Sequence, residues 1–357
     1  MKRELGSLAK HRAWLELPPK KGSVVPFPCE PKKVFAAQVA GLAKRLKAIR
    51  CRDVVIGLSG GLDSTLALLV ADAAFAKLKY DKAGIHVYTM PGFGTSKRTK
   101  GNADLLCEGL GLKLETISIV KSVRQHLKDI GHDGKTPDVT YENAQARMRT
   151  MILMDKANMT GGIVIGTGDL SEIALGWSTY NGDHMSMFAV NNDVPKTVVR
   201  KVCQWWADSH SSGGDAASPL SGRVWLAVKS IRDVINTPVS PELVKGQVTE
   251  DKIGPYELHD FFLWNFIMNE MGSRDLQLAA ERYFSPNLRQ TSQTSQTSQT
   301  SQTFPKPLIA KTLKTFMWRF FTQAFKRNCQ PDGVKVFPFE LSLHGWWIPS
   351  DLGFVNI

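Results

Sequence analysis

Several features that define common protein classes are missing from this chain. Its five cysteines are scattered, odd in number and never spaced as C-x-x-C, which argues against a disulfide framework and a structural zinc site. No run of about 18 apolar residues, the length of a membrane helix, is present; the longest apolar stretch, Leu66 to Ala76, contains Asp72. The basic start, Met1 to Lys10, lacks the apolar core of a signal peptide. These absences predict a globular protein of the reducing cytoplasm, with no membrane partner.

The charge of the chain is biased to one sign. Its 357 residues include 45 Lys and Arg against 33 Asp and Glu, a formal net charge of +12. Such an excess attracts anions over long distances, but it does not distinguish nucleic acid from a small phosphate compound. With 43% hydrophobic and 22% charged residues, the composition is that of a protein able to bury a sizeable core.

Strand and helix patterns alternate through the first half of the sequence. Short apolar runs predict buried strands at 54–58, 85–90, 114–119 and 162–165. Helical periodicity predicts helices at 31–50, 63–79, 97–110 and 141–158. Alternation of this kind implies parallel strands with right-handed crossovers, and such open sheets bind ligands beyond the carboxyl ends of their strands. We therefore predict an α/β fold, a Rossmann-like open parallel sheet with helices on both faces.

Composition divides the chain into four parts. Four prolines predict an irregular N-terminal arm over residues 1–30, and the α/β domain follows over 31–285. A tandem Thr-Ser-Gln repeat predicts a low-complexity loop over 286–305. The last part, 306–357, contains a helical, aromatic and basic pattern at 311–327, which predicts a helical C-terminal extension. Towards the end of the α/β domain, 237–255 is expected to be loop-like and 256–271 helical.

The loop after the first predicted strand carries the most chemical information. It reads Gly57-Leu58-Ser59-Gly60-Gly61-Leu62-Asp63-Ser64 and leads into a helix. Glycines let the backbone approach a ligand closely, the helix start offers free N–H groups and a positive dipole end, and the two serines add hydroxyls. This combination suits a phosphate or pyrophosphate group. Asp63 would repel such an anion unless a cation lies between them, which points to Mg²⁺.

Other readings of this loop stay open. The lysine of a Walker A loop and the dinucleotide pattern G-x-G-x-x-G are both absent. However, Gly57 to Gly61 fits G-x-S-x-G, the nucleophile elbow of α/β-hydrolases, with Ser59 as the nucleophile. No motif around the later histidines selects a base for that serine. A serine hydrolase, and a nucleotide-binding module without catalysis, remain the alternatives from other functional classes.

The SGG-x-DS pattern after a strand resembles the pyrophosphate loop of the ATP pyrophosphatase superfamily, whose members form adenylated intermediates. Further segments select one family within it. They are YENAQARMR at 141–149, GTGDLSE at 166–172 and GWSTY at 176–180, with shorter matches at 90–93, 194–197, 253–258 and 325–327. On these residues the chain resembles the NAD synthetase family, specifically the synthetase domain of the glutamine-dependent type. The resemblance implies an adenine nucleotide alpha hydrolase-like fold.

The resemblance implies a ligase that forms a C–N bond. Deamido-NAD would be adenylated by ATP at its nicotinate carboxylate with release of pyrophosphate, and ammonia would then displace AMP to give NAD. Both steps pass through extra negative charge, so cations and fixed donors are expected to dominate catalysis. The implied catalytic residues are Asp63, Glu172 and Lys196, of which the two acids are also the implied Mg²⁺ ligands. A tRNA-modifying enzyme of the same superfamily is the alternative, although its sulfur-inserting members need paired cysteines, and nucleic acid is not the expected partner.

The resemblance also implies which residues bind the two substrates. Those for ATP are Gly57, Leu58, Ser59, Gly60, Gly61, Leu62, Asp63, Ser64, Thr167, Lys196 and Ser240. Those for deamido-NAD are Asn143, Arg147, Glu172, Trp177, Ser178, Thr179, Tyr180, Asp183 and Lys326. Because Lys326 belongs to the segment 306–357, that segment is expected to complete the substrate site.

One part of the glutamine-dependent enzymes has no counterpart in this sequence. Those enzymes carry an N-terminal nitrilase-like glutaminase domain with a Glu-Lys-Cys triad, for which the residues before the loop leave no room. Ammonia would then come free from solution or from a separate glutaminase subunit, which are the favoured expectations, or the sequence is a piece of a longer protein. The resemblance further implies a homodimer or a larger homo-oligomer.

Overall fold

The computed structural model of the chain describes residues 24, 26–211, 221–238, 243, 248–285 and 302–341. The arm predicted over 1–30 and the Thr-Ser-Gln loop predicted over 286–305 lie almost entirely outside the described residues. Ser240 and the end of the chain, 342–357, lie outside them as well.

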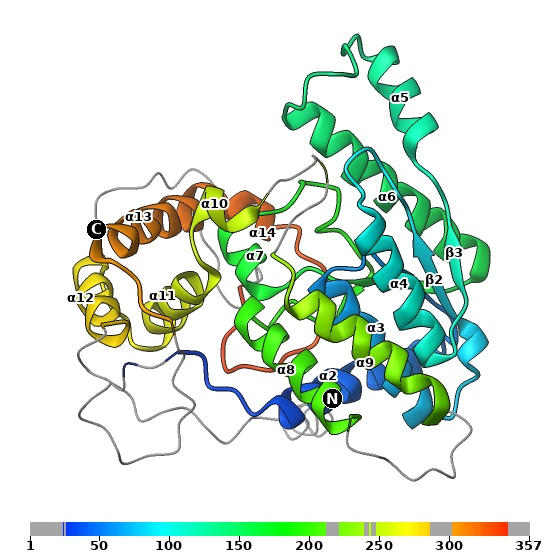
Figure 1. Ribbon diagram of the computed structural model, residues 1–357, viewed down its shortest axis with the longest axis horizontal. Coiled ribbons are helices and arrows are strands. Elements are labelled where there is room, and N and C mark those ends of the chain that lie inside the picture. Colours follow the sequence, from blue (N-terminus) through cyan, green and yellow to red (C-terminus); the bar gives the residue numbers. More distant parts are fainter. Residues whose placement is uncertain are drawn as a thin grey trace, which may run out of the picture.

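A parallel sheet forms the centre of the fold (Figure 1). Its strands are β1 (Val54–Gly57), β2 (Ile85–Thr89), β3 (Leu114–Thr116), β4 (Ile163–Gly166) and β5 (Phe188–Ala189). The order across the sheet is β3-β2-β1-β4-β5, and every pair is parallel. The predicted α/β fold with a Rossmann-like parallel sheet is therefore confirmed. The strand order reverses between β1 and β4, which makes the carboxyl ends of these two strands the switch point where such sheets bind ligands.

Side chains that alternate along β1 serve two different cores, because successive residues of a strand point to opposite faces. Val54 and Ile56 are buried in the main core, together with apolar residues of α2 (Pro31–Ala48) and α3 (Leu62–Leu78). Val55 packs instead with Ala157 of α6 (Val139–Thr160) on the other face. The first face also carries α8 (Lys196–Ser209) and α9 (Ser221–Ile235), which pack on α3. Two further helices follow β2 and β3, namely α4 (Lys97–Leu110) and α5 (Val120–Asp129).

A second group of helices lies to one side of the sheet (Figure 1). It consists of α10 (Thr249–Ile253), α11 (Tyr256–Met268), α12 (Ser273–Tyr283), α13 (Lys306–Thr322) and α14 (Ala324–Arg327). Aromatic rings hold α11 and α13 together, with Phe262 and Phe316 centroids 5.9 Å apart. The short helix α7 (Leu170–Leu175) after β4 packs against α11, α13 and α14. The second group is thereby attached directly beside the switch point.

The predicted elements agree with the structure in their order, and most of the differences lie at boundaries. Strand β3 ends at Thr116, short of the predicted residue 119, because its partner β2 ends at Thr89 and is soon followed by Pro91, which has no N–H. The segment 237–255 contains α10 and is not entirely loop-like. Sequence patterns missed α5, α7, α8, α9, α12 and the two-residue β5. No helix in the described part of the chain is both long and apolar enough to cross a membrane.

Candidate functional site

A cavity of about 860 Å³ opens at the switch point. Its lining includes the ends of β1 and β4, the start of α3, one side of α6 and parts of α7, α13 and α14. The volume lies within the range of small-molecule sites. All eight residues of the Gly57–Ser64 loop line this cavity. The position is the one expected for a ligand of an open α/β sheet.

Close backbone approach explains the glycines of the loop. Gly60 has φ +82°, and a Cβ atom there would lie 2.3 Å from the carbonyl oxygen of Thr99, so only glycine fits. The Ser59 hydroxyl accepts a hydrogen bond from the Gly61 N–H at 3.1 Å and lies 2.9 Å from the Ser64 hydroxyl. Gly61 caps α3 without a side-chain bond, which leaves first-turn N–H groups for an anionic ligand.

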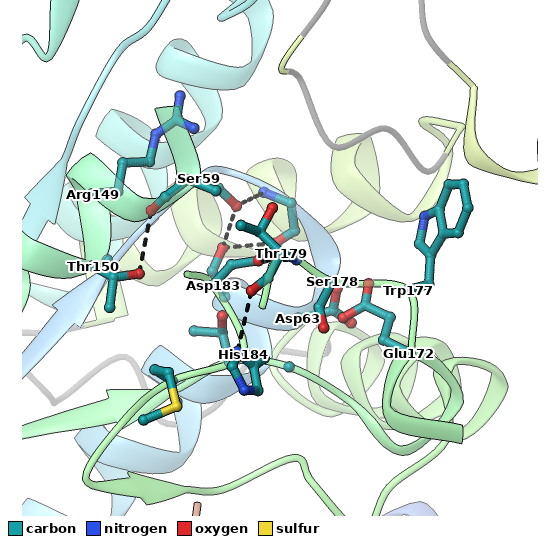
Figure 2. A pocket seen from close by; sticks show the side chains of 18 of the residues that line it. Ser59, Asp63, Arg149, Thr150, Glu172, Trp177, Ser178, Thr179, Asp183 and His184 are labelled. Carbon is teal, nitrogen blue, oxygen red and sulfur yellow. Dashed lines mark hydrogen bonds between the residues drawn. The ribbon is translucent and has the colours of Figure 1, made fainter. Parts of the chain in front are cut away.

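Behind the loop, one buried ammonium meets three carboxylates. Lys196 Nζ lies 2.5 Å from Asp63 Oδ2, 2.7 Å from Asp169 Oδ2 and 2.9 Å from Glu172 Oε1. The three acids come from the first turn of α3, the N-cap of α7 and the first turn of α7, whereas Lys196 is the first residue of α8. Figure 2 shows the carboxylates of Asp63 and Glu172 next to each other at the cavity. We call these four residues the acid cluster.

Burial changes the pKa of two acids in the cluster. It raises the pKa of Glu172 to about 7 and that of Asp169 well above its ordinary value, against the opposing attraction of Lys196. Burial alone would lower the pKa of Lys196, but the carboxylates of Asp169, Asp63 and Glu172 raise it well above its ordinary value. The three carboxylates that surround Lys196 therefore favour its charged form.

The acid cluster has the donor set of a hard divalent cation. One carboxylate oxygen from each acid lies within 4.8 Å of the others. Asp63 Oδ1 is buried and has no hydrogen-bond partner among the described residues. Three carboxyl groups gather around a single ammonium, and oxygen donors of this kind suit Mg²⁺. The residues present therefore fit the metal that the sequence predicted.

Asp169 is the member of the acid cluster that the sequence analysis missed. It is fully buried, and its carboxylate accepts the Glu172 N–H at 2.9 Å as the N-cap of α7. The available signal was its position in GTGDLSE, three residues before Glu172. An acid at a helix start is common for capping reasons alone, so its second role becomes visible only when Lys196 is placed beside it.

The GWSTY segment is held in place from two directions. Thr179 donates its hydroxyl to Asn143 Oδ1 at 2.7 Å and its N–H to Asp183 Oδ1 at 2.7 Å. Lys326 Nζ donates to the carbonyl oxygens of Gly176 and Ser178, at 2.8 and 2.7 Å. Burial raises the pKa of Asp183. These bonds join α6, α14 and the segment after α7 at the edge of the cavity.

Most of the other predicted site residues reach the same cavity. Asn143, Thr167, Glu172, Trp177, Ser178, Thr179, Tyr180, Asp183 and Lys326 all line it. Arg147 is not among the lining residues, but its Nε donates to the carbonyl oxygen of Tyr180 at 3.1 Å. Lys196 lies behind the wall, in the acid cluster. Arg319, which the sequence analysis did not name, lies in the lining with its guanidinium 4.8 Å from the Trp177 ring centroid.

The hydrolase alternative finds no support at Ser59. Among the described residues, no histidine is hydrogen bonded to Ser59, whose partners are the Ser64 hydroxyl and the Gly61 N–H. His184 alone among the described histidines lines the cavity, and it lies 3.1 Å from the Thr179 carbonyl oxygen and 3.2 Å from Cys329 Sγ. A nucleophile elbow needs a base within hydrogen-bond reach of its serine.

Comparison with known proteins gives a consistent result. Residues 34–303 match the family model described as NAD synthase. The glutamine-dependent NAD(+) synthetase of Mycobacterium leprae is 38% identical over 352 residues, which cover 92% of this chain and 50% of that protein. The enzyme of the same description from Thermotoga maritima is 33% identical over 246 residues, covering 68% and 39%. The chain thus spans about half the length of the curated relatives it matches.

Two solved structures share the fold. A glutamine-dependent NAD(+) synthetase from Cytophaga hutchinsonii superimposes with a TM-score of 0.65 at 16% identity, over 90% of this chain and 54% of that one. An NMN synthetase from Francisella tularensis gives a TM-score of 0.55 at 23% identity, over 76% of this chain and all of that one (100%). At these identities the likeness concerns the fold alone.

Proposed function

Since this chain belongs to the NAD synthase family, we propose that it converts deamido-NAD to NAD with ATP and ammonia. One observation carries the proposal. The glycine- and serine-rich loop, the acid cluster and the GWSTY segment line or border a single cavity at the switch point of the sheet. A phosphate-type site and a second, partly aromatic site within one cavity suit a reaction that joins a nucleotide to a second substrate.

In the first step, a carboxylate oxygen of deamido-NAD attacks the α-phosphorus of ATP, and the bond to pyrophosphate breaks. The loop N–H groups, the hydroxyls of Ser59 and Ser64 and the positive end of α3 bind the departing pyrophosphate. Asp63, Glu172 and Asp169 would hold Mg²⁺, which supplies positive charge against the phosphate oxygens. The Lys196 ammonium keeps the buried acids from repelling one another before substrates arrive.

In the second step, ammonia attacks the acyl carbon of the adenylate. The C–N bond forms, the bond to AMP breaks, and the nitrogen loses a proton to become the amide. We propose that Trp177, Ser178, Thr179 and Tyr180 surround the nicotinate ring, since an aromatic plane suits a pyridine. The bonds from Asn143, Asp183 and Lys326 fix that segment, which orients the reacting carboxylate.

The nitrogen source and the assembly belong to the same proposal. Ammonia is taken free from solution or from a separate glutaminase subunit, and the chain forms a homodimer or a larger homo-oligomer. The proposed setting is the cytoplasm, in agreement with five cysteines that are all free thiols.

The reaction is tested by product analysis. Incubation with deamido-NAD, ATP, Mg²⁺ and ammonium is expected to give NAD, AMP and pyrophosphate. Formation of ADP and phosphate would refute the pyrophosphate-loop mechanism. Nicotinate mononucleotide is the comparison substrate, because an NMN synthetase has the same fold. Replacing ammonium by glutamine shows whether this chain alone can supply its nitrogen.

Two substitutions test the proposed metal ligands. Asp63→Ala and Glu172→Ala are each expected to abolish turnover, because each removes an oxygen donor from the acid cluster. The matched control is Asp129→Asn, which removes an exposed acid at the end of α5. Full activity in either alanine variant would show that the metal assignment is wrong.

A further inference from the structure

The N-terminus of α8 is capped by two other helices. Pro195 precedes Lys196 and makes no side-chain cap, yet the first N–H groups of a helix need acceptors. The Lys196 N–H donates to Ser171 Oγ of α7 at 2.8 Å, and the Thr197 N–H donates to Asp260 Oδ2 of α11 at 3.0 Å. The Ser171 hydroxyl in turn donates to Asp260 Oδ1. One serine and one aspartate therefore satisfy the start of α8.

Both ends of Lys196 are fixed by the same helix, α11. Tyr256 and Asp260 are four residues apart, so they share one face of α11. The Tyr256 ring lies with its centroid 5.3 Å from Lys196 Nζ, whereas Asp260 acts on the backbone next to Lys196. Ser171, Lys196, Tyr256 and Asp260 are each at most 2% exposed. Such dense burial leaves this part of α8 little freedom to shift.

The same cap fixes the acid cluster. Ser171 and Glu172 are neighbours in α7, and both contact Lys196, one through its N–H at 2.8 Å and the other through its ammonium at 2.9 Å. A displacement of the α8 terminus would therefore move the ammonium relative to all three carboxylates at once. Neither Ser171 nor Asp260 lines the cavity, so neither is in a position to contact substrate.

We propose that Asp260 and Ser171 are positioning residues, which cap α8 and so place the Lys196 ammonium in the acid cluster for nucleotide binding. The inference rests on the proposed function and adds a role for two buried side chains behind the site. It makes a specific claim of dependence, because the two residues act on the nucleotide only through Lys196.

A mutant cycle on nucleotide affinity tests that dependence. The probe is the α,β-methylene analogue of ATP with Mg²⁺, titrated into the full chain by calorimetry. Ser171→Ala and Asp260→Asn are each expected to weaken binding roughly 10-fold, as is usual for residues that orient a ligating group. In a Lys196→Met background the same substitutions should change the dissociation constant by less than about twofold. Equal losses in both backgrounds would overturn the proposal.

A matched control separates positioning from plain loss of stability. Asp193 is also a buried acid, and it accepts the N–H groups of Val336 and Phe337 at 2.5 and 2.6 Å. Asp193→Asn changes a buried acid in the same way as Asp260→Asn, but it is expected to weaken binding of the analogue equally with and without Lys196. If the effect of Asp193→Asn on affinity depended on Lys196 as strongly as that of Asp260→Asn, the role of Asp260 would be merely structural.

Two outcomes keep this proposal distinct from the proposed function. If Asp260→Asn fails to fold, Ser171→Ala carries the test, because it removes a single oxygen atom. A wild-type chain that binds no analogue would overturn the proposed function and this inference together. The inference alone would be overturned if the wild type binds the analogue tightly, but Ser171→Ala and Asp260→Asn weaken binding by the same factor with and without Lys196.

Discussion

Replacing Lys196 by methionine is expected to destabilise the protein in a way that Mg²⁺ reverses. The ammonium lies 2.5 to 2.9 Å from oxygens of three carboxylates and is almost completely buried. Methionine keeps most of the apolar stem but leaves the acids without their cation. Removing one partner of a buried ion pair costs about 3–5 kcal/mol, a large part of the 5–15 kcal/mol that typically separates folded from unfolded protein.

The reversal follows from the composition of the acid cluster. Without Lys196, the carboxylates of Asp63, Asp169 and Glu172 face one another with no counter-charge among the described residues. A divalent cation that binds them stabilises the folded state by mass action. The variant is therefore expected to gain more free energy of unfolding from Mg²⁺ than the wild type, in which the ammonium competes for the same oxygens.

Urea denaturation at pH 8 measures the loss of stability in EDTA and, when it is repeated in millimolar Mg²⁺, the gain in stability from the metal. The control is Lys326→Met, which removes another ammonium, one bonded to the carbonyl oxygens of Gly176 and Ser178. Its expected loss is about 1–2 kcal/mol, with no change in the response to Mg²⁺. The reasoning is refuted if Lys196→Met costs less than about 1 kcal/mol, or if all three proteins respond equally to the metal.

Three further predictions concern other parts of the site. Burial raises the pKa of Asp260 to about 6 against 3.8 in ordinary surroundings, so its contribution of about 3 kcal/mol to stability is present below pH 4 and lost as the pH rises to 6. When the free energy of unfolding is measured by denaturation between pH 4 and pH 6, it should depend less steeply on pH for Asp260→Asn than for the wild type. Gly60→Ala places a Cβ 2.3 Å from the Thr99 carbonyl oxygen at φ +82°, so we expect a loss of at least about 1 kcal/mol and weaker binding of the ATP analogue by calorimetry. Ser59→Ala should retain measurable NAD formation, and a serine-reactive phosphonate should leave the wild type unlabelled; labelling at Ser59 would restore the hydrolase reading.

The sheet was predictable because its signals are local. The apolar run of β1 and the loop after it are contiguous in sequence, and the glycines and Asp63 of that loop predict the turn into α3. Strand β5 has two residues and no run to detect. Helix α8 begins after a proline that offers no side-chain acceptor, and its cap comes from α7 and α11. No local pattern can report a cap that is supplied from another part of the chain.

The site was predictable in part for the same reason. Asp63 lies in the loop itself, and Glu172 and the GWSTY segment belong to stretches that resemble a family. Asp169 was missed because an acid at a helix start needs no further explanation. The contact of Lys196 with three acids depends on the approach of α3, α7 and α8, which spans more than a hundred residues of sequence. Sequence alone therefore indicated that Lys196 is a cation of the site, whereas only the fold shows which acids surround it.

The whole chain carries a positive net charge, whereas the acid cluster gathers three carboxyl groups around one ammonium, and this contrast leads to a last prediction. The net charge of +12 attracts phosphates at long range, but beside the loop a triphosphate meets three carboxylates and one ammonium. A divalent cation between them turns this local repulsion into attraction. Raising KCl from about 0.01 M to about 0.1 M shortens the screening length from about 30 Å to about 10 Å, which weakens only the long-range part. Removing Mg²⁺ with EDTA should therefore weaken binding of the ATP analogue more than this change in salt does. The opposite ranking in calorimetry would mean that the surface charge, and not the acid cluster, controls affinity for the nucleotide.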